Sequence, residues 1–193
     1  GREQLQAVLW MQAAAEYRAI AEQTWRLATE RLPSLVQPGS AAAEQWGMDP
    51  LQLASLPTAV IVDLDETVLD NSFYQARQAR ARRDYDDASW NAWIQEAAAT
   101  TIPGARDFLW AATRAGHRVF YVTNRECQPA GADACPQKTG TQRNLVALGL
   151  PGADDPDSLL LRRERPEWSA SDKSARRAWL GDRYRIIALG GDD

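Results

Sequence analysis

Two acidic residues, separated by one position, follow the first short apolar run of the chain and could do chemistry together. Asp63 and Asp65 come directly after Ala59–Val62, a continuous apolar run of the kind that forms a strand buried on both faces. At the end of such a strand, one carboxylate can attack phosphorus while the other protonates the departing oxygen and later activates water. The alternative is that the two acids only end the strand and bind the amides of a turn.

A cation is expected beside these acids, because neighbouring carboxylates repel each other. Mg2+ suits such a site, since a few carboxylates together with phosphate oxygens and water make its octahedral shell. A second acidic pair, Asp192 and Asp193, follows Gly190 and Gly191 after the fourth apolar run. Glycine permits a close approach of the backbone, so these acids can complete the metal shell.

Residues that suit phosphate oxygens follow the second apolar run. Thr123, Asn124 and Arg125 come after Val119–Val122 and offer a hydroxyl, backbone N–H groups and a guanidinium. Lys173 opens the helical stretch before the fourth run and could bring a positive charge to the phosphoryl group. A lone lysine on a helix is ordinarily solvated. Here acids, hydroxyl, lysine and acids occur in this order at strand ends and at one helix start, which favours a single phosphate-handling site.

The elements that must position these residues alternate along the chain. The four apolar runs are 59–62, 119–122, 159–161 and 186–189. Between them lie helical stretches, each followed by a glycine that can end a helix, at 105–115, 142–148 and 173–180. The alternation predicts an α/β fold with a Rossmann-like, mostly parallel sheet flanked by helices, whose ligands bind outside the carboxyl ends of the strands.

Two segments lie outside this alternation. Residues 1–32 place apolar side chains at helical intervals, which predicts one amphipathic helix in an N-terminal helical segment, 1–57, that packs on the core, 58–193. Residues 70–101 are too long for a simple crossover and predict a small cap inserted after the first strand. The aromatic residues of this cap could form a flat surface for a base or an aromatic leaving group, or belong to the core; they are Phe73, Tyr74, Trp90 and Trp93.

The bulk composition indicates a soluble globular protein and excludes some partners. The 193 residues are 45% hydrophobic and 25% charged, and the net charge of -4 gives no general attraction for a nucleic-acid polymer or an anionic bilayer. No apolar run approaches the roughly 18 to 20 residues that cross a membrane. Cys127 and Cys135, eight positions apart, could close a short loop by a disulfide in an oxidising compartment, or remain two free thiols.

The chain resembles the haloacid dehalogenase superfamily, and more closely the bacterial class C non-specific acid phosphatases. The segments that carry the resemblance span nearly the whole chain: VLWMQ at 8–12, AEYR at 15–18, VDLDETVLDNS at 62–72, IPGA at 102–105, FYVTNR at 120–125, KS at 173–174 and GD at 191–192. Together these motifs are specific.

The resemblance implies a role for each candidate residue. Asp63 is expected to be the nucleophile and Asp65 the acid/base, with magnesium held by Asp63, the Asp65 carbonyl and Asp192. Thr123 and Lys173 are expected on the phosphoryl group. Further substrate-binding residues are expected among the polar side chains near these motifs, namely Asn71, Asn124 and Arg125.

The resemblance also implies a magnesium-dependent acid phosphatase that acts on small phosphomonoesters, often nucleoside monophosphates. It implies an exported bacterial protein, periplasmic or associated with the outer membrane, with a lipid anchor upstream of this chain left open. The family continues past its fourth motif with another acid, so we expect the C-terminal part of the core to be absent after Asp193. Two alternatives share the motifs: a phosphotransferase that passes the phosphoryl group to an alcohol, and a non-catalytic phosphate-binding or storage relative.

Overall fold

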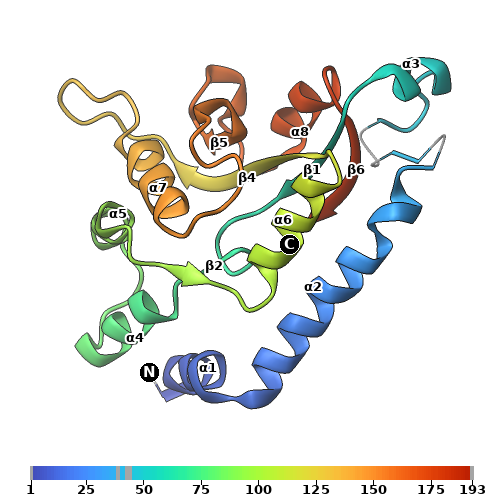
Figure 1. The fold of residues 1–193 in the computed structure, drawn as a ribbon. Helices are drawn as coiled ribbons and strands as arrows, with labels where there is room; N and C mark the ends of the chain where they lie inside the picture. Colours follow the sequence, from blue (N-terminus) through green and yellow to red (C-terminus); the bar gives the residue numbers. More distant parts are fainter. Residues whose placement is uncertain (1, 38–39, 42–44, 192–193) are drawn as a thin grey trace.

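The centre of the molecule is a parallel sheet of four strands. The computed structural model describes residues 2–37, 40–41 and 45–191. Within them the sheet has the order β5-β4-β1-β6, and every neighbouring pair is parallel. Its strands are β1 (Thr58–Val62), β4 (Arg118–Glu126), β5 (Leu159–Arg162) and β6 (Arg185–Gly190). This confirms the predicted α/β fold and the four predicted strands (Figure 1).

Alternate side chains of each central strand enter two separate hydrophobic clusters, as expected for a sheet covered on both faces. Val60 and Val62 pack with residues of α6 (Ala105–Arg114) and α7 (Pro136–Ala147), while Ala59 and Ile61 pack with residues of α8 (Ser174–Gly181). The sheet therefore lies between two helical layers. Helix α6 runs over one face, with α2 (Ala15–Leu35) beyond it, and α8 covers the other face (Figure 1).

The register of the strands brings their carboxyl ends to one level. Val62 pairs with Tyr121 of β4 on one side and with Gly190 of β6 on the other. Asp63 after β1 and Gly191 after β6 therefore lie at the same edge of the sheet as Thr123 of β4. The predicted second strand ended at Val122, whereas β4 continues to Glu126.

The N-terminal segment contains two helices where one was expected. Helix α1 (Arg2–Ala13) and α2 are separated at Ala14, whose backbone is extended with φ -78° and ψ 123°. No proline or glycine marks this break, so apolar periodicity could not locate it. Helix α1 packs against α4, and Gln12 donates a hydrogen bond of 3.1 Å to Ser72 at the start of that helix.

Helix α2 approaches the core closely because of one glycine. A Cβ added to Gly104, whose φ is +86°, would lie 3.1 Å from the Cβ of Trp25 and 3.2 Å from the Cα of Glu22. The rings of Trp25 and Phe108 then pack with their centroids 5.0 Å apart. A side chain at position 104 would be strained both by this close contact and by the left-handed backbone.

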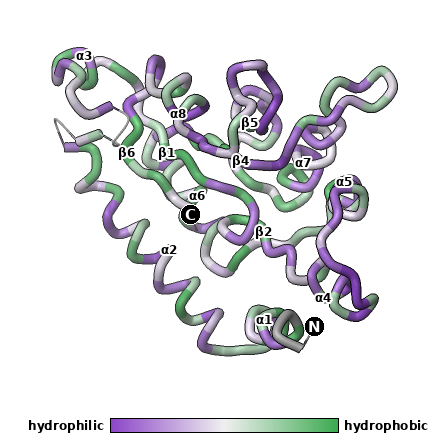
Figure 2. Tube along the Cα trace, turned by 180° about the vertical axis from the view of Figure 1, so that it is seen from behind, coloured by the Kyte–Doolittle hydropathy of each residue, from purple (hydrophilic) through white to green (hydrophobic). Residues whose placement is uncertain are grey.

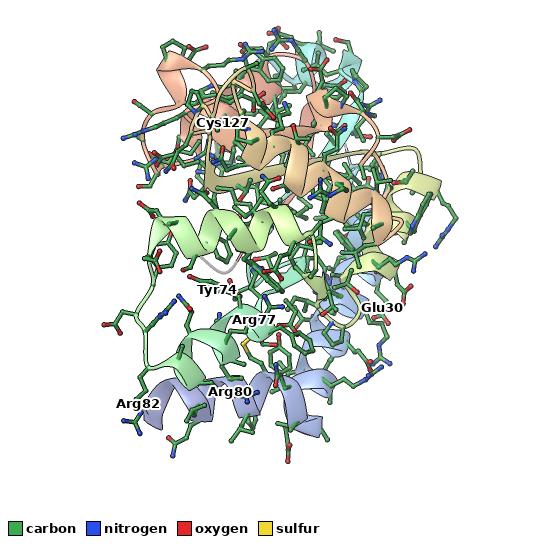
Figure 3. All side chains as sticks on the ribbon, turned by 90° about the vertical axis from the view of Figure 1, so that its left-hand side faces the viewer. Glu30, Tyr74, Arg77, Arg80, Arg82 and Cys127 are labelled. Carbon is green, nitrogen blue, oxygen red and sulfur yellow. A yellow bond between two sulfur atoms is a disulfide. The ribbon has the colours of Figure 1, made fainter. Side chains whose placement is uncertain are left out.

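The segment expected to form a cap contains two helices between a pair of short strands. Strands β2 (Leu69–Asp70) and β3 (Thr100–Thr101) pair antiparallel and enclose α4 (Ser72–Ala81) and α5 (Asp87–Glu96). Tyr74 packs edge-on against Trp90 at 5.1 Å between ring centroids, and Figure 3 shows Tyr74 between α4 and α5. The remaining elements are short: α3 (Pro50–Ser55), η2 (Pro156–Ser158) and η3 (Pro166–Trp168).

The predicted helices 105–115 and 173–180 match α6 and α8 within one residue, whereas α7 begins six residues before the predicted start at Gln142. Pro136 occupies the first turn of α7, where a proline is tolerated because its missing N–H is not needed. The buried face of α7 includes Gln137, Thr141 and Asn144. A polar buried face has no apolar period, so the sequence pattern missed the first half of this helix.

Along α2, the longest helix, hydrophobic and hydrophilic residues alternate, as Figure 2 shows. Among the residues that the structure describes, we find no helix long and apolar enough to cross a membrane.

Cys127 and Cys135 are joined by a disulfide, as the sequence suggested was possible in an oxidising compartment. The bond closes a short loop between the end of β4 and the start of α7, with the two Cα atoms 4.7 Å apart. The loop is tied to neighbouring elements: the Cys127 N–H donates to the Arg162 carbonyl at 2.9 Å, and the Gln128 N–H donates to the Gln137 side chain at 2.9 Å.

We predict that replacing both cysteines by serine lowers the free energy of unfolding by about 2 to 3 kcal/mol, because a closed loop of about nine residues restricts the unfolded chain. Denaturant titrations of the unreduced parent and the double serine variant measure the difference. Equal midpoints and slopes would contradict the prediction, and mass spectrometry of the unreduced parent checks that the bond is present in the sample.

Candidate active site

Asp63 lies at the centre of the carboxyl edge of the sheet. Its N–H donates to the carbonyl of Gly190 in β6 at 2.8 Å, so the end of β6 fixes the backbone just after β1. Its side chain is almost buried, and one carboxylate oxygen lies 3.2 Å from the ammonium nitrogen of Lys173. Lys173 directly precedes α8. The structure thus brings together two predicted site residues that are 110 positions apart in the sequence (173 minus 63).

Burial dominates the electrostatics of Asp63. Loss of hydration raises the pKa of its carboxyl group from 3.8 to about 6, and the nearby negative charge of Asp65 acts in the same direction. The ammonium of Lys173 lowers this pKa, but it does not offset the burial. The carboxylate is therefore under-compensated by the described side chains, and a further positive charge beside it would favour the ionised form.

Asp65 is held by a network of donors on its side chain. The guanidinium of Arg125 contacts both carboxylate oxygens, with Nη2 at 2.7 Å from Oδ1 and Nε at 3.1 Å from each oxygen. The side-chain amide of Asn71 donates to Oδ1 at 2.9 Å, and the Thr123 hydroxyl lies at 3.4 Å from Oδ2. Asn71 is in turn oriented by the indole N–H of Trp93 at 2.8 Å. Asp65 is therefore fixed in one orientation.

Arg125 is predicted to bind substrate, and the structure places its guanidinium against Asp65. The side chain is buried, with 3% of the residue exposed. Besides Asp65, it donates to the Thr141 hydroxyl of α7 at 3.0 Å and lies 5.4 Å above the ring of Trp90 in α5. A buried guanidinium with a carboxylate partner and an aromatic face is typical of a structural ion pair. In this structure Arg125 therefore supports Asp65.

The remaining predicted residues are placed as follows. The carbonyl oxygen of the Asn124 side chain accepts a hydrogen bond of 2.7 Å from Arg176. The Thr123 hydroxyl accepts from the Arg125 N–H at 3.1 Å and faces Asp65. Asp192 lies outside the described residues, so its predicted part in the metal site is not placed. In the described part of the chain, no three side chains of Asp, Glu, His or Cys converge on one point.

A pocket of about 390 Å3 opens beside Asp65. One wall is aromatic and consists of Tyr74, Tyr85 and Trp90, while Asn71 and Gln75 contribute polar groups. Of the four aromatic residues considered, Tyr74 and Trp90 line this pocket, whereas Trp93 is buried behind Asn71 and Phe73 lines another hollow beside α1. Tyr74 and Trp93 also belong to the hydrophobic core. A second pocket, of about 220 Å3, lies beside Asp63 and Lys173.

Three residues of the site were not identified from the sequence, and a fourth, Trp93, was named only as part of a possible aromatic surface. Tyr85 extends the aromatic wall, Trp93 orients Asn71, Thr141 holds Arg125, and Arg176 holds Asn124. Two weak sequence signals could have pointed to Tyr85 and Arg176. Tyr85 lies beside the predicted cap helix, and Arg176 lies four positions before the buried Leu180 of α8. Neither signal is specific, because both residue types are common on solvated surfaces.

The fold and these motif residues define a member of the haloacid dehalogenase superfamily. Over residues 2–193, the chain matches the family described as HAD superfamily, subfamily IIIB (Acid phosphatase), and it belongs to that family.

Solved structures and a curated relative share this similarity. The class C acid phosphatase from Bacillus anthracis with tungstate bound superimposes with a TM-score of 0.79 and 29% identity, covering 99% of this chain and 69% of that one. Another structure of the Bacillus anthracis class C acid phosphatase superimposes with a TM-score of 0.74 and 29% identity, covering 96% of this chain and 66% of that one. Acid phosphatase 1 of Solanum lycopersicum is 25% identical over 135 residues, 68% of this chain and 49% of that protein. The chain thus spans about half the length of that curated relative.

We predict that the contribution of Asp63 to the free energy of unfolding of the metal-free protein falls as the pH rises from about 4 to about 6. In this window the folded state still holds a proton on Asp63, whose pKa is about 6, while the unfolded state has lost it. The unfolded state binds fewer protons, so rising pH favours it.

Denaturant titrations of the parent and of Asp63→Asn, both with a chelator, measure this effect. The difference in stability between the two proteins isolates the contribution of residue 63, because all other titrating groups are shared. We expect the parent to lose stability relative to Asp63→Asn as the pH rises. A difference that stays constant across the window would show that Asp63 titrates normally.

Proposed function

We propose that this chain is an acid phosphatase that hydrolyses small phosphomonoesters through an aspartyl-phosphate on Asp63. The observation that carries the proposal is the contact of 3.2 Å between the buried Asp63 carboxylate and Lys173, at a sheet edge where Asp65 and Thr123 also lie. A nucleophile buried beside a cation is suited to meet an anionic ester. Membership of the acid phosphatase subfamily and the tungstate-bound structure of the Bacillus anthracis enzyme support the same assignment.

In the first step, a carboxylate oxygen of Asp63 forms a bond to phosphorus while the bond from phosphorus to the ester oxygen breaks. Asp65 gives its proton to that departing oxygen, which leaves as an alcohol. Asn71 and Arg125 keep the Asp65 carboxyl group in a fixed orientation for this transfer. The products of the step are the free alcohol and a phosphoryl group on Asp63.

In the second step, water attacks the phosphorus of the aspartyl-phosphate. Asp65, now ionised, takes a proton from the water as the new bond forms. The bond between phosphorus and the Asp63 oxygen breaks, which releases inorganic phosphate and restores the Asp63 carboxylate. Each carboxyl group thus returns to its starting state, and the cycle needs no further reactant.

The phosphoryl group is proposed to bind between Lys173 and Thr123. Lys173 supplies a positive charge directly at the Asp63 carboxylate. The Thr123 hydroxyl can donate one hydrogen bond, so the proton that now faces Asp65 would turn to a phosphoryl oxygen when substrate binds. Asn124 would contribute its backbone N–H, because its side chain is held by Arg176.

Magnesium is the proposed cofactor, and the described residues fit it. The Asp63 carboxylate and the Asp65 backbone carbonyl are hard oxygen donors, and a bound cation would offset the burial that raises the pKa of Asp63. Asp192 is proposed as the third ligand. When bound, Mg2+ would neutralise part of the charge that separates an anionic carboxylate from an anionic ester.

The pocket beside Asp65 is proposed to hold the leaving group. Its volume of about 390 Å3 and its wall of Tyr74, Tyr85 and Trp90 suit a small organic group with a flat ring. Nucleoside monophosphates are therefore the proposed substrate class. We further propose that the protein is exported, an inference supported by the disulfide, since such bonds persist in oxidising compartments.

We predict that the chain hydrolyses a chromogenic phosphomonoester in the presence of Mg2+, and that Asp63→Asn reduces turnover to below about one percent of the parent, because an amide cannot attack phosphorus. Release of the chromophore by the two purified proteins measures the effect. Activity should vanish with a chelator and return when Mg2+ is added. A parent chain without turnover would refute the proposed function, and an active Asp63→Asn variant would refute the assignment of the nucleophile.

We predict that Asp65→Asn slows substrates with poor leaving groups far more than aryl phosphates with good ones, because only a poor leaving group needs a proton. Rates for a series of phosphomonoesters, plotted against the pKa of the released alcohol, give the comparison. The plot should be steeper for the variant than for the parent. Parallel plots would show that Asp65 does not act as the acid.

A further inference from the structure

Arg176 is a buried cation whose only role so far is to hold the Asn124 side chain. It lies in the first turn of α8, three positions after Lys173, and none of its surface is exposed. Its side chain is the largest of those that are almost completely buried. Helix α8 covers one face of the sheet, where a side chain in this place would ordinarily be apolar.

The guanidinium of Arg176 joins two segments that are distant in the sequence. Its Nη1 donates to the backbone carbonyl of Thr123, and its Nη2 lies 2.7 Å from the side-chain oxygen of Asn124, both at the carboxyl end of β4. The same Nη2 lies 3.4 Å from the carbonyls of Ser171 and Asp172, in the turn before α8. One planar group therefore spans the gap between β4 and α8.

Each of these segments carries one residue proposed to bind the phosphoryl group. Thr123 lies at the end of β4, and Lys173 directly follows the turn that contains Ser171 and Asp172. Both residues must reach the same group above Asp63. The contacts of Arg176 therefore join the two backbone segments that carry the Thr123 hydroxyl and the Lys173 ammonium.

Burying the Arg176 guanidinium costs hydration free energy, which a residue that only filled space would not need to lose. Among the described residues no carboxylate lies within ion-pair distance of Arg176, and its buried Nε has no hydrogen-bond partner. Burial lowers the pKa of the guanidinium, although the negative charge of Asp63 acts against this. An apolar side chain of similar volume would avoid the loss of hydration. The specific contacts at the two segments are what such a side chain could not provide.

We propose that Arg176 is a positioning residue of the active site, whose guanidinium fixes the spacing between Thr123 and Lys173 so that both contact one phosphoryl group over Asp63. The proposal rests on the proposed function. The geometry of the guanidinium matters here as much as its charge, because its fixed fork directs separate N–H groups at separate carbonyl oxygens. A lysine ammonium keeps the charge but cannot hold both segments at a set distance.

Arg185 provides a matched control for the cost of altering a buried arginine. It is also buried and also has an Nε without a hydrogen-bond partner. It begins β6, at the opposite end of the sheet from Asp63, and its Nη2 donates to the carbonyl of Val36 at 3.1 Å. A loss of stability alone should therefore appear in Arg185→Lys as well as in Arg176→Lys.

The test compares Arg176→Lys, Arg185→Lys and the parent chain with Mg2+, using thermal unfolding, the kcat and KM for a chromogenic phosphomonoester, and the binding of inorganic tungstate by calorimetry. We expect Arg176→Lys to lower kcat by at least about tenfold and to weaken tungstate binding by about tenfold, with a smaller change in KM, because misplacement of about 1 Å at a reacting centre is costly. Arg185→Lys should lower the melting temperature and leave kcat and tungstate affinity within about twofold.

The outcomes separate this proposal from the proposed function. A parent that binds tungstate but hydrolyses no ester refutes the function, while tungstate affinity still reports on Arg176. A parent chain that neither binds tungstate nor hydrolyses the ester overturns both the proposed function and the positioning role of Arg176. A folded Arg176→Lys with kcat and affinity within about twofold of the parent overturns the positioning role, and so does an equal loss in Arg185→Lys.

A second pair of variants keeps the proposal testable if Arg176→Lys does not fold. Asn124→Asp retains a side-chain oxygen for Arg176, whereas Asn124→Leu removes it. We expect the aspartate variant to keep at least about threefold more activity than the leucine variant, because it preserves the contact. If the Asn124 side chain instead contacted the phosphoryl group, the added negative charge would make Asn124→Asp the worse variant, which would overturn the proposal.

Discussion

The burial of the Asp63 carboxylate beside Lys173 is the interaction on which the rest of the site depends. A buried anionic group at the carboxyl edge of a sheet needs a nearby positive charge. The ammonium of Lys173, 3.2 Å from the carboxylate, provides part of this charge. Burial still raises the pKa of Asp63 to about 6. A further positive charge beside Asp63 would therefore favour its ionised form, in agreement with the proposed magnesium-dependent chemistry.

The parallel sheet makes that burial possible. Because β1 lies between β4 and β6, the residue after β1 is surrounded by the ends of both neighbours, and the Asp63 N–H bonds to Gly190. The two hydrophobic clusters fix the sheet between helices on both faces. A shift of one residue in the register of β1 would exchange the residues of its two faces, so packing also secures the position of Asp63.

Core and cap segment are joined through Asp65 and Arg125. The Arg125 guanidinium binds Asp65 after β1, Thr141 in α7 and the ring of Trp90 in α5. The disulfide loop follows directly, and Asn91 of α5 donates to its Gln128 at 2.9 Å. The wall of the pocket and the carboxyl group proposed to protonate the leaving group thus share one support. A change near Trp90 in α5 would therefore alter the position of Arg125 and, through it, the orientation of Asp65.

The sequence by itself determined the four strands, their parallel arrangement and the set of residues at their ends. Continuous apolar runs, and the acids or hydroxyl that follow them, are local patterns. Such patterns can be recognised in the sequence without knowing which distant residues each side chain contacts. The partners of polar side chains depend on segments distant in the chain, so only the tertiary structure decided that Arg125 supports Asp65 and that Arg176 joins Thr123 to the turn before Lys173. The same limit applies to helices: the sequence carries no local signal for the break at Ala14, and the polar buried face of α7 has no apolar period.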